Sequence, residues 1–193
     1  MNTLLKSTLF SLAIATSGFA TAATYVIDDV RSGAHSQLDV KVSHLGISWV
    51  KGRFDDFSGS FEYDKDKIND SSIEVTIQTT SFDSNHAKRD KHIMSSDVLN
   101  ASKYPTATFK STSIEDMGDG KVKVNGDLNL HGVTKAISFD AALIGEGKSP
   151  WGDYRAGFEG SADLKFADFN IDTKKIGTND FTINMFFEGK ESK

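Results

Sequence analysis

Side chains that can do chemistry are concentrated in one short stretch, SNHAKRDKH, residues 84–92, which holds two of the five histidines. Two imidazoles and a carboxylate are suitable zinc ligands, and an imidazole with a carboxylate can also act in general acid–base catalysis. On a helix, His86 and Asp90 share a face, but His92 is turned about 120° from His86. On a strand, the two histidines stand roughly 20 Å apart. Neither geometry gathers all three at one ion, so we interpret the stretch as a solvated helical turn.

An enzyme built on this stretch would need partners from elsewhere, and His44 and His131 are the plausible donors. The sequence contains no G-x-S-x-G, H-E-x-x-H, P-loop or G-x-G-x-x-G motif. A dispersed catalytic triad stays open, because triads are recognised by geometry and not by order. A metal-dependent or hydrolytic enzyme using His44, His86 and Asp90 is therefore the alternative hypothesis, and we expect no catalysis.

The N-terminus has the pattern of a secretory signal peptide. Lys6 precedes an uncharged stretch with an apolar core at residues 9–19, and an A-x-A sequence follows. The core is shorter than the about 20 apolar residues that a membrane-spanning helix needs. We expect a signal peptide over residues 1–22 cleaved after Ala22, export to the periplasm, and one mature domain over residues 23–193 with no transmembrane segment.

Charge and cysteine content narrow the class of protein further. The net charge of −5 becomes more negative once Lys6 is removed, and the chain has no cysteine. A negative surface repels nucleic acid and anionic lipid headgroups, so we expect no nucleic-acid partner. Without cysteine the domain has neither disulfides nor a lipoprotein anchor, so it must be held together by packing.

Alternating apolar and polar residues run through most of the mature chain, which is typical of strands with one buried face. The clearest runs start at residues 38, 73, 122, 137, 156 and 183. The apolar phase slips near Asp55 and Asp56, which predicts a β-bulge or a sharp bend. Gly132 predicts a tight hairpin, and residues 117–121 a second turn. About eight strands with short connections predict an all-β, eight-stranded antiparallel barrel, because closure removes exposed strand edges.

One segment breaks the alternation. Residues 86–99 are rich in Ala, Lys, Arg and Met, and Ser84 or Asn85 can cap a helix. We predict a short helical segment there, ending before the extended sequence YPTATF. We expect Arg89 and Asp90 to fix how this segment packs on the barrel.

The inward side chains of such a barrel either fill a core or line a tunnel. Eight strands leave an interior just wide enough for side chains or for one elongated ligand. Small inward residues suit a tunnel, but they also suit tapering and bending of strands. They are Gly52, Gly126, Ala156, Gly160 and Ala162. Periodicity alone does not decide between the two arrangements.

Three blocks of sequence resemble, in order and spacing, the YceI-like family of bacterial periplasmic proteins. They are HLGISWVKGRFDDFSGSFEYD, TTSFDSNHAKRDKHIMSSDVLNASKYPTATFKSTS and GDLNLHGVTKAISFDAALIGEG. The resemblance implies an extended, lipocalin-like β-barrel whose hydrophobic pore holds a long polyisoprenoid or a related amphiphilic lipid. Residues 171–183 depart from the family pattern, so the headgroup preference is open if that segment borders the mouth.

We therefore expect a periplasmic lipid-binding protein, active in transport or storage, that needs no metal or cofactor and could form a homodimer. Fifteen inward residues are predicted to line the pore: Leu38, Val40, Val42, Phe54, Phe61, Ile73, Val75, Ile77, Phe109, Leu128, Leu130, Phe139, Phe158, Ile183 and Met185. His44, Trp49 and Arg53 are predicted to lie at its mouth. There Arg53 could pair with a phosphate or carbonyl headgroup.

Overall fold

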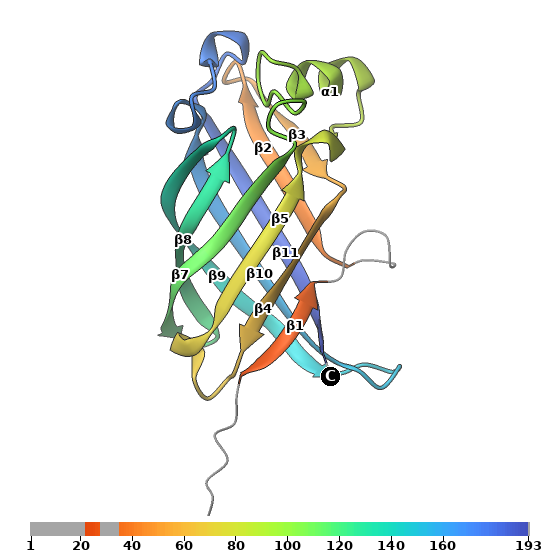
Figure 1. Ribbon diagram of the computed structural model, residues 1–193, viewed down its shortest axis with the longest axis vertical. Helices are drawn as coiled ribbons and strands as arrows, with labels where there is room; N and C mark the ends of the chain where they lie inside the picture. The colour runs from red at the N-terminus through yellow and green to blue at the C-terminus, as the bar shows by residue number, and fades with distance from the viewer. Residues whose placement is uncertain (1–21, 28–34, 193) are drawn as a thin grey trace, which may run out of the picture.

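Eight strands form a closed antiparallel barrel (Figure 1). The computed structural model describes residues 22–27 and 35–192, so the predicted signal peptide lies outside the described residues except for Ala22. In ring order the strands are β1 (Ala23–Ile27), β4 (Phe57–Tyr63), β5 (Ser72–Gln78), β7 (Thr106–Gly118), β8 (Lys121–Leu130), β9 (Val133–Lys148), β10 (Tyr154–Lys165) and β11 (Asp180–Glu191). β11 pairs with β1 and closes the ring. The predicted eight-stranded barrel is confirmed.

Three further strands enlarge the sheet at the upper end of the barrel in Figure 1. They are β2 (Gln37–His44), β3 (Ser48–Phe54) and β6 (Phe82–Asp83). β2 pairs with residues 181–186 of β11, whereas β1 pairs with residues 189–191. The two strands therefore share one edge of β11, and β2 continues into a hairpin with β3.

A bend at Asp55 and Asp56 separates β3 from β4, where the phase slip predicts a bulge or a bend. The backbone groups of both residues bond to residues 78–81, with N···O distances of 3.2 and 2.8 Å. Phe54 and Phe57 are both buried, on either side of the bend. The bend therefore lets two aromatic side chains three positions apart face the interior.

The two predicted turns are confirmed. His131 and Gly132 form a two-residue turn with φ of +54° and +75°, between the paired residues Leu130 and Val133 of β8 and β9. Asp119 and Gly120 also have positive φ, at the turn between β7 and β8. Positive φ at both central residues matches the twist of the flanking strands.

The predicted helical segment contains one α-helix, α1 (Ala87–Met94). The prediction that Ser84 or Asn85 caps it was wrong, because the cap is His86, whose Nδ1 accepts from the Arg89 amide at 3.2 Å. Ser84 is engaged elsewhere: its amide and hydroxyl both donate to the Asp90 carboxylate. Its hydroxyl oxygen also accepts from Arg89 Nε at 2.6 Å.

The other helices are single 3₁₀ turns in the connections. They are η2 (Ile68–Asp70), η3 (Thr79–Ser81), η4 (Phe166–Phe169) and η5 (Thr173–Lys175). Over residues 22–27 and 35–192, none of the helices has the length and hydropathy that a membrane crossing requires.

Phenylalanine rings fill the space that some inward glycines leave. A methyl group on Gly52 would lie 2.3 Å from Cζ of Phe82, and one on Gly126 would lie 2.5 Å from Cζ of Phe109. Each ring comes from a neighbouring strand and covers the bare backbone of the glycine. These two glycines therefore serve close packing and do not open a tunnel.

Alanine at Gly126 tests this close approach. The new methyl group would also lie 2.5 Å from the Lys110 carbonyl oxygen, which is backbone and cannot rotate away. We expect Gly126→Ala to lower the free energy of unfolding by about 1 to 3 kcal/mol, as overpacked cores do. Gly145→Ala is the matched control, since no atom lies within 4 Å of its new methyl group. Urea unfolding measures both, and equal stability of the two variants would contradict the packing role.

Candidate functional site

Two cavities lie in the barrel interior: the upper one is bordered by α1 and the β2–β3 hairpin, and the lower one by Tyr63, Ile68 and neighbouring strand residues. The lower cavity has a volume of about 110 Å³ and the upper cavity about 270 Å³. Roughly 10 to 15 Å³ suffices for a single water molecule, so each cavity holds far more than a packing defect would. Both walls are mostly apolar, and apolar cavities of this size accept apolar ligands.

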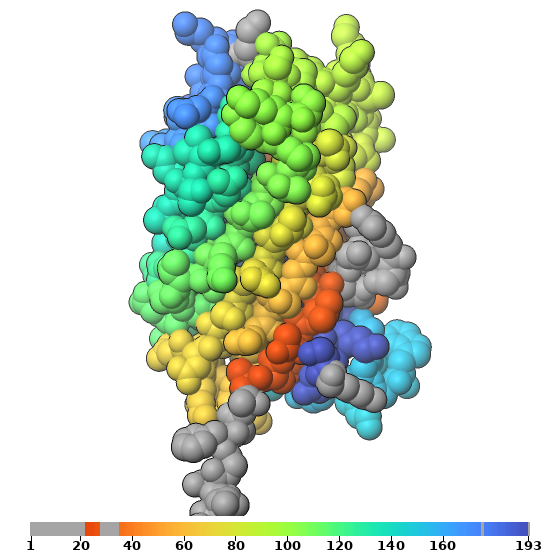
Figure 2. Space-filling view, in the orientation of Figure 1, coloured from red at the N-terminus to blue at the C-terminus, as the bar shows by residue number. Residues whose placement is uncertain are grey.

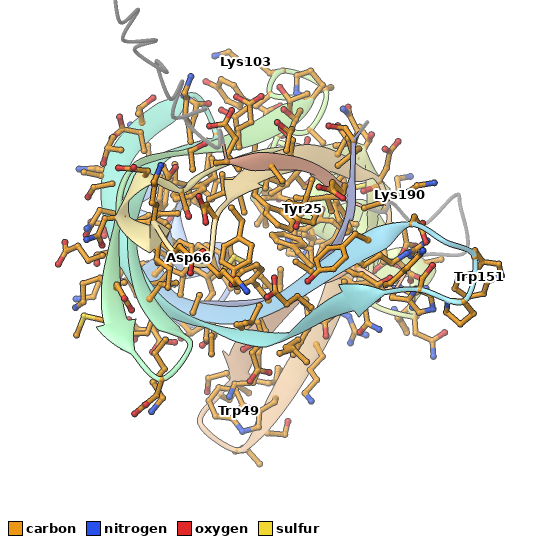
Figure 3. All side chains as sticks on the ribbon, turned by 90° about the horizontal axis from the view of Figure 1, so that it is seen from below. Tyr25, Trp49, Asp66, Lys103, Trp151 and Lys190 are labelled. Atoms are coloured by element: carbon orange, nitrogen blue, oxygen red, sulfur yellow. The ribbon has the colours of Figure 1, made fainter. Side chains whose placement is uncertain are left out.

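The lower cavity ends in a cluster of aromatic rings. Tyr25 stacks on Phe61 at 5.0 Å between centroids, and Tyr63 meets Phe158 edge-on at 5.2 Å. Figure 3, which looks up the barrel from below, shows Tyr25 inside the ring of strands. Burial is the main cause that raises the pKa of Tyr25 to about 12 and raises that of Tyr63. Both hydroxyls are neutral at physiological pH, as an ordinary tyrosine is, and burial extends that neutral range to higher pH.

The upper cavity is roofed by segments outside the eight-stranded ring. Ile93, Val98 and Leu99 contribute from α1 and the turns after it, and Phe166 and Ile176 from the connection between β10 and β11. The search for alternating apolar residues missed these residues because they do not lie on strands. Two features of the sequence could have indicated some of them: Ile93 is an apolar residue within the predicted helical segment, and residues 98–99 are an adjacent apolar pair.

The upper cavity has nitrogen-bearing side chains on its wall, of which His44 and His92 are exposed to solvent; His92 Nε2 also lies 3.9 Å from the Asp97 carboxylate. His44, Arg89 and His92 lie on its wall, whereas no Lys, Arg or His lies on the wall of the lower cavity. The polar members of the lower wall are Glu62, Ser71, Ser72 and Glu159. The two cavities thus differ in chemistry, and cationic or imidazole contacts are possible only in the upper one.

Three residues line both cavities and mark the place where they adjoin. They are Ile77 on β5, Leu128 on β8 and Ile183 on β11, from three different parts of the ring. All three are apolar, so an alkyl chain that passes from one cavity to the other meets no polar side chain here. The two cavities are therefore neighbours with an apolar boundary between them.

The structure places all fifteen predicted lining residues on a cavity wall. Those on the lower wall are Leu38, Phe61, Ile73, Val75, Phe109, Phe139, Phe158 and Met185. Those on the upper wall are Val40, Val42, Phe54 and Leu130, and the shared residues Ile77, Leu128 and Ile183 complete the set. Contact of these residues with a ligand stays a prediction.

Two of the three residues predicted at the mouth lie away from the cavity walls. His44 is on the upper wall. Trp49 is 61% exposed, with Lys41 Nζ 4.3 Å from its ring centroid. Arg53 points outward and pairs with Asp55 at 2.6 Å. Of the three, His44 is therefore the one placed to meet a ligand inside the barrel.

The residues of the alternative enzyme hypothesis do not assemble into a site. Asp90 is bound to Ser84, and His86 caps α1, while His44 faces the upper cavity. The Ser84 hydroxyl is the main cause that lowers the pKa of Asp90. Over the described parts of the chain, no three His, Asp or Glu side chains are grouped so that they could hold a metal ion. Nothing in this arrangement favours an enzyme.

The segment 171–183 borders the upper cavity, through Ile176, Phe181 and Ile183. Phe181 stacks on Phe166 at 4.4 Å between centroids, which fixes the segment against the roof. The part of the sequence that departs from the family pattern thus contributes to the upper wall.

Comparison with known proteins gives a consistent result. A family model for a YceI-like domain matches residues 25–188. A UPF0312 protein of Vibrio parahaemolyticus is 53% identical over 171 residues, which cover 86% of this chain and 89% of the relative. A UPF0312 protein of Vibrio vulnificus is 51% identical over 184 residues, 95% of each chain.

Solved structures share the barrel. The YCEI protein of Campylobacter jejuni is 32% identical with a TM-score of 0.71, covering 79% of this chain and 91% of its own. Burkholderia cenocepacia BcnA has a TM-score of 0.74 at 24% identity, with coverage of 83% and 98%. A polyisoprenoid binding domain from Saccharophagus degradans has a TM-score of 0.66 at 15% identity, with coverage of 89% and 99%. The last two show a common fold.

The contact between Asp90 and Ser84 predicts a pH-dependent contribution to stability. We expect Asp90→Ala to lower the free energy of unfolding by about 1 to 3 kcal/mol at neutral pH, because the amide and hydroxyl of Ser84 lose their charged acceptor. The folded pKa lies below the unfolded value of about 3.9. The stabilisation is therefore present above that value and is lost as the pH falls through the folded pKa.

Urea unfolding of the wild type and Asp90→Ala between neutral pH and about pH 3 measures this difference. The difference should shrink on acidification. Asp66→Ala, at an exposed position in the turn between β4 and β5, controls for the general effect of removing a carboxylate. A stability difference for Asp90→Ala that is the same at every pH would contradict the charged contact.

Proposed function

The chain belongs to the YceI-like family, and on that premise we propose that it binds one long-chain amphiphilic lipid, a polyisoprenoid or a related molecule, inside the barrel. The observation that carries this proposal is the pair of adjoining apolar cavities, of which only the upper one has Arg and His side chains on its wall. Each buried CH₂ group contributes about 0.8 kcal/mol. A long apolar chain therefore gains enough from this interior to be carried through water.

The length of the barrel suits an extended chain. β8 has ten residues, which span roughly 33 Å at the rise of a strand. We propose that the tail lies along this axis, past Ile77, Leu128 and Ile183, and ends near Tyr25. The lining residues predicted from the sequence would make apolar contacts and do no chemistry.

The headgroup would lie in the upper cavity. Arg89 donates from Nε and Nη2 to Ser84 at 2.6 and 2.7 Å, so its guanidinium is held in place on the cavity wall. His44 and His92 lie on the same wall. A fixed guanidinium with two imidazoles suits a phosphate, a carbonyl or a phenolic oxygen.

The cellular role follows from the same reasoning. We propose that the protein is exported to the periplasm, that residues 23–193 act as one lipid-binding domain, and that it transports or stores its lipid without catalysis. The Saccharophagus degradans neighbour, a polyisoprenoid binding domain of the same fold, supports this choice of ligand class.

Native mass spectrometry of the protein purified from a bacterial periplasm tests the proposal. We expect a mass increase that fits one lipid per chain, which organic extraction releases and identifies. A lipid-free mass in every preparation, with no uptake from membrane extracts, would refute it. A bound metal ion, or turnover lost in His44→Ala or His86→Ala, would instead support the alternative enzyme.

Obstructing the lower cavity tests the position of the tail. Ala141 on β9 lies on the lower wall, and a methyl group on Gly160 would lie 3.2 Å from its Cβ. We expect Ala141→Phe to shift the bound population toward shorter tails, because its ring occupies tail volume. Ala142→Phe is the matched control, since successive strand residues point to opposite faces. Native mass spectrometry of folded variants reads the lipid masses, and unchanged tail lengths in Ala141→Phe would place the tail elsewhere.

A further inference from the structure

Three large apolar side chains are exposed together at the turn between β2 and β3. Leu45 is 66% exposed, Ile47 83% and Trp49 61%. We call residues 45–49 the hairpin tip. Figure 3 shows Trp49 outside the ring of strands, pointing away from the barrel interior. Exposed apolar side chains that cluster in this way mark a surface that meets another apolar phase.

The hairpin tip holds Leu45 in an unfavourable backbone conformation. Its φ is +56°, in the left-handed region that leucine rarely adopts. The turn is closed by the Ile47 amide, which donates to the His44 carbonyl at 3.0 Å, and by the Gly46 amide, which donates to Ser43 Oγ at 3.2 Å. Asparagine or glycine would form this turn without strain, so folding alone does not account for an exposed leucine here.

Lysines flank the hairpin tip. Lys41 and Lys51 are direct cross-strand partners, and the Nζ of Lys41 lies over the Trp49 ring. Like charges placed opposite each other on two strands repel. Among the described residues, neither lysine forms an ion pair with a carboxylate. A negatively charged surface would relieve this repulsion.

Charges of both signs occur at each end of the barrel, and the chain as a whole is negative. At the upper end, α1 adds exposed Lys88 and Lys91, while the connection between β10 and β11 adds exposed Asp172 and Asp180. The turns at the lower end in Figure 1 carry several acids together with lysines: Asp64, Asp66, Asp116, Asp119, Lys65, Lys67 and Lys121. Attraction to an anionic surface therefore depends on Lys41 and Lys51 beside the hairpin tip and on the lysines of α1.

The hairpin tip is continuous with the wall of the upper cavity. Ser43, His44 and Val50, which flank the tip, all lie on that wall. A methyl group on Gly177 would lie 3.6 Å from Cδ2 of Leu45, so the tip also touches the connection between β10 and β11 that roofs the cavity. Whatever the tip contacts is thereby brought beside the proposed headgroup position.

We infer that the hairpin tip docks on an anionic lipid bilayer and places the upper cavity at the membrane surface, where the bound lipid is exchanged. Ile47 and Leu45 enter the apolar boundary of the bilayer, Trp49 lies at the headgroup level, and Lys41 and Lys51 contact anionic headgroups. The exchange role rests on the proposed function, whereas the docking itself does not.

A second exposed apolar tip serves as an internal comparison. Trp151 is 77% exposed and Ile144 64%, on the loop that projects at the lower right of Figure 2 and the strand leading to it. This tip shares its surface with Glu146 and Glu188 as well as with Lys148, and Arg155 beside it is already paired with Asp153 and Glu188. The acids beside this tip make it less suited to an anionic bilayer than the hairpin tip, although its apolar exposure is similar.

The two tryptophans of the chain, one on each tip, allow a direct experiment. Trp151→Phe leaves Trp49 as the fluorophore, and Trp49→Phe leaves Trp151. Each variant is mixed with vesicles of phosphatidylethanolamine and phosphatidylglycerol that carry brominated acyl chains, which quench tryptophan on contact. We expect quenching in Trp151→Phe and none in Trp49→Phe. The quenching should be lost in vesicles of phosphatidylcholine alone and weakened at about 0.5 M salt, where the Debye length is only a few ångströms.

Vesicle co-sedimentation with charge substitutions completes the test. We expect Ile47→Asp to weaken binding about tenfold or more, because an acid replaces the most exposed apolar side chain. Ile144→Asp should leave binding unchanged, and thermal unfolding verifies that both variants fold. Equal quenching of both tryptophans, or none, would overturn the inference. So would a wild-type dimer that Ile47→Asp dissociates without any vesicle binding, since the tip would then join two copies of the chain.

Native mass spectrometry of the same samples separates docking from lipid binding. We expect Ile47→Asp to retain bound lipid but to transfer it to acceptor vesicles more slowly than the wild type. A lipid-loaded wild type that does not bind anionic vesicles would refute docking and leave the proposed function standing. A wild type that docks but never carries lipid would refute the proposed function and the exchange role together, while docking itself would stand.

Discussion

The pairing of β1 with β11 is the interaction on which the rest of the structure depends. β1 has only five residues, yet it joins β4 to β11 and completes the ring. Because the ring is closed, every inward strand position faces one enclosed volume and does not pack against a second layer. β1 also carries Tyr25, which stacks on Phe61 and closes the base of that volume. Closure of the ring and part of the aromatic cluster at its lower end thus come from the same short strand.

The enclosed volume is filled in some places and hollow in others, according to what the neighbouring strand offers. Phe82 covers Gly52 and Phe109 covers Gly126, so those positions are packed. At Gly160 the facing residue is Ala141, and both lie on the lower cavity wall. An inward glycine is therefore covered by a phenylalanine ring in one place and lies beside open space in another. The outcome depends on which side chain of the neighbouring strand faces the glycine, and that side chain is distant in sequence.

Arg and His side chains lie on the wall of the upper cavity because the segments that interrupt the barrel meet at this end. α1, the β2–β3 hairpin and the connection between β10 and β11 all contribute to the upper cavity. Arg89 both donates hydrogen bonds to Ser84 and lies on the cavity wall. The proposed headgroup site and the proposed docking tip therefore both lie at this end.

The sequence by itself determined the barrel, its antiparallel pairing, the bend at Asp55 and the inward position of residues such as Ile77, because strand periodicity is a local property. The local sequence pattern did not predict that His86 caps α1, since the hydroxyl of Ser84 is bonded to Asp90 and Arg89. It also did not distinguish glycines covered by a phenylalanine ring from glycines beside a cavity. Only the tertiary structure decided that the interior holds two cavities, and that Arg89 and His92 face one of them while Trp49 faces outward. Those outcomes depend on contacts between segments far apart in the chain, which no spacing along the sequence encodes.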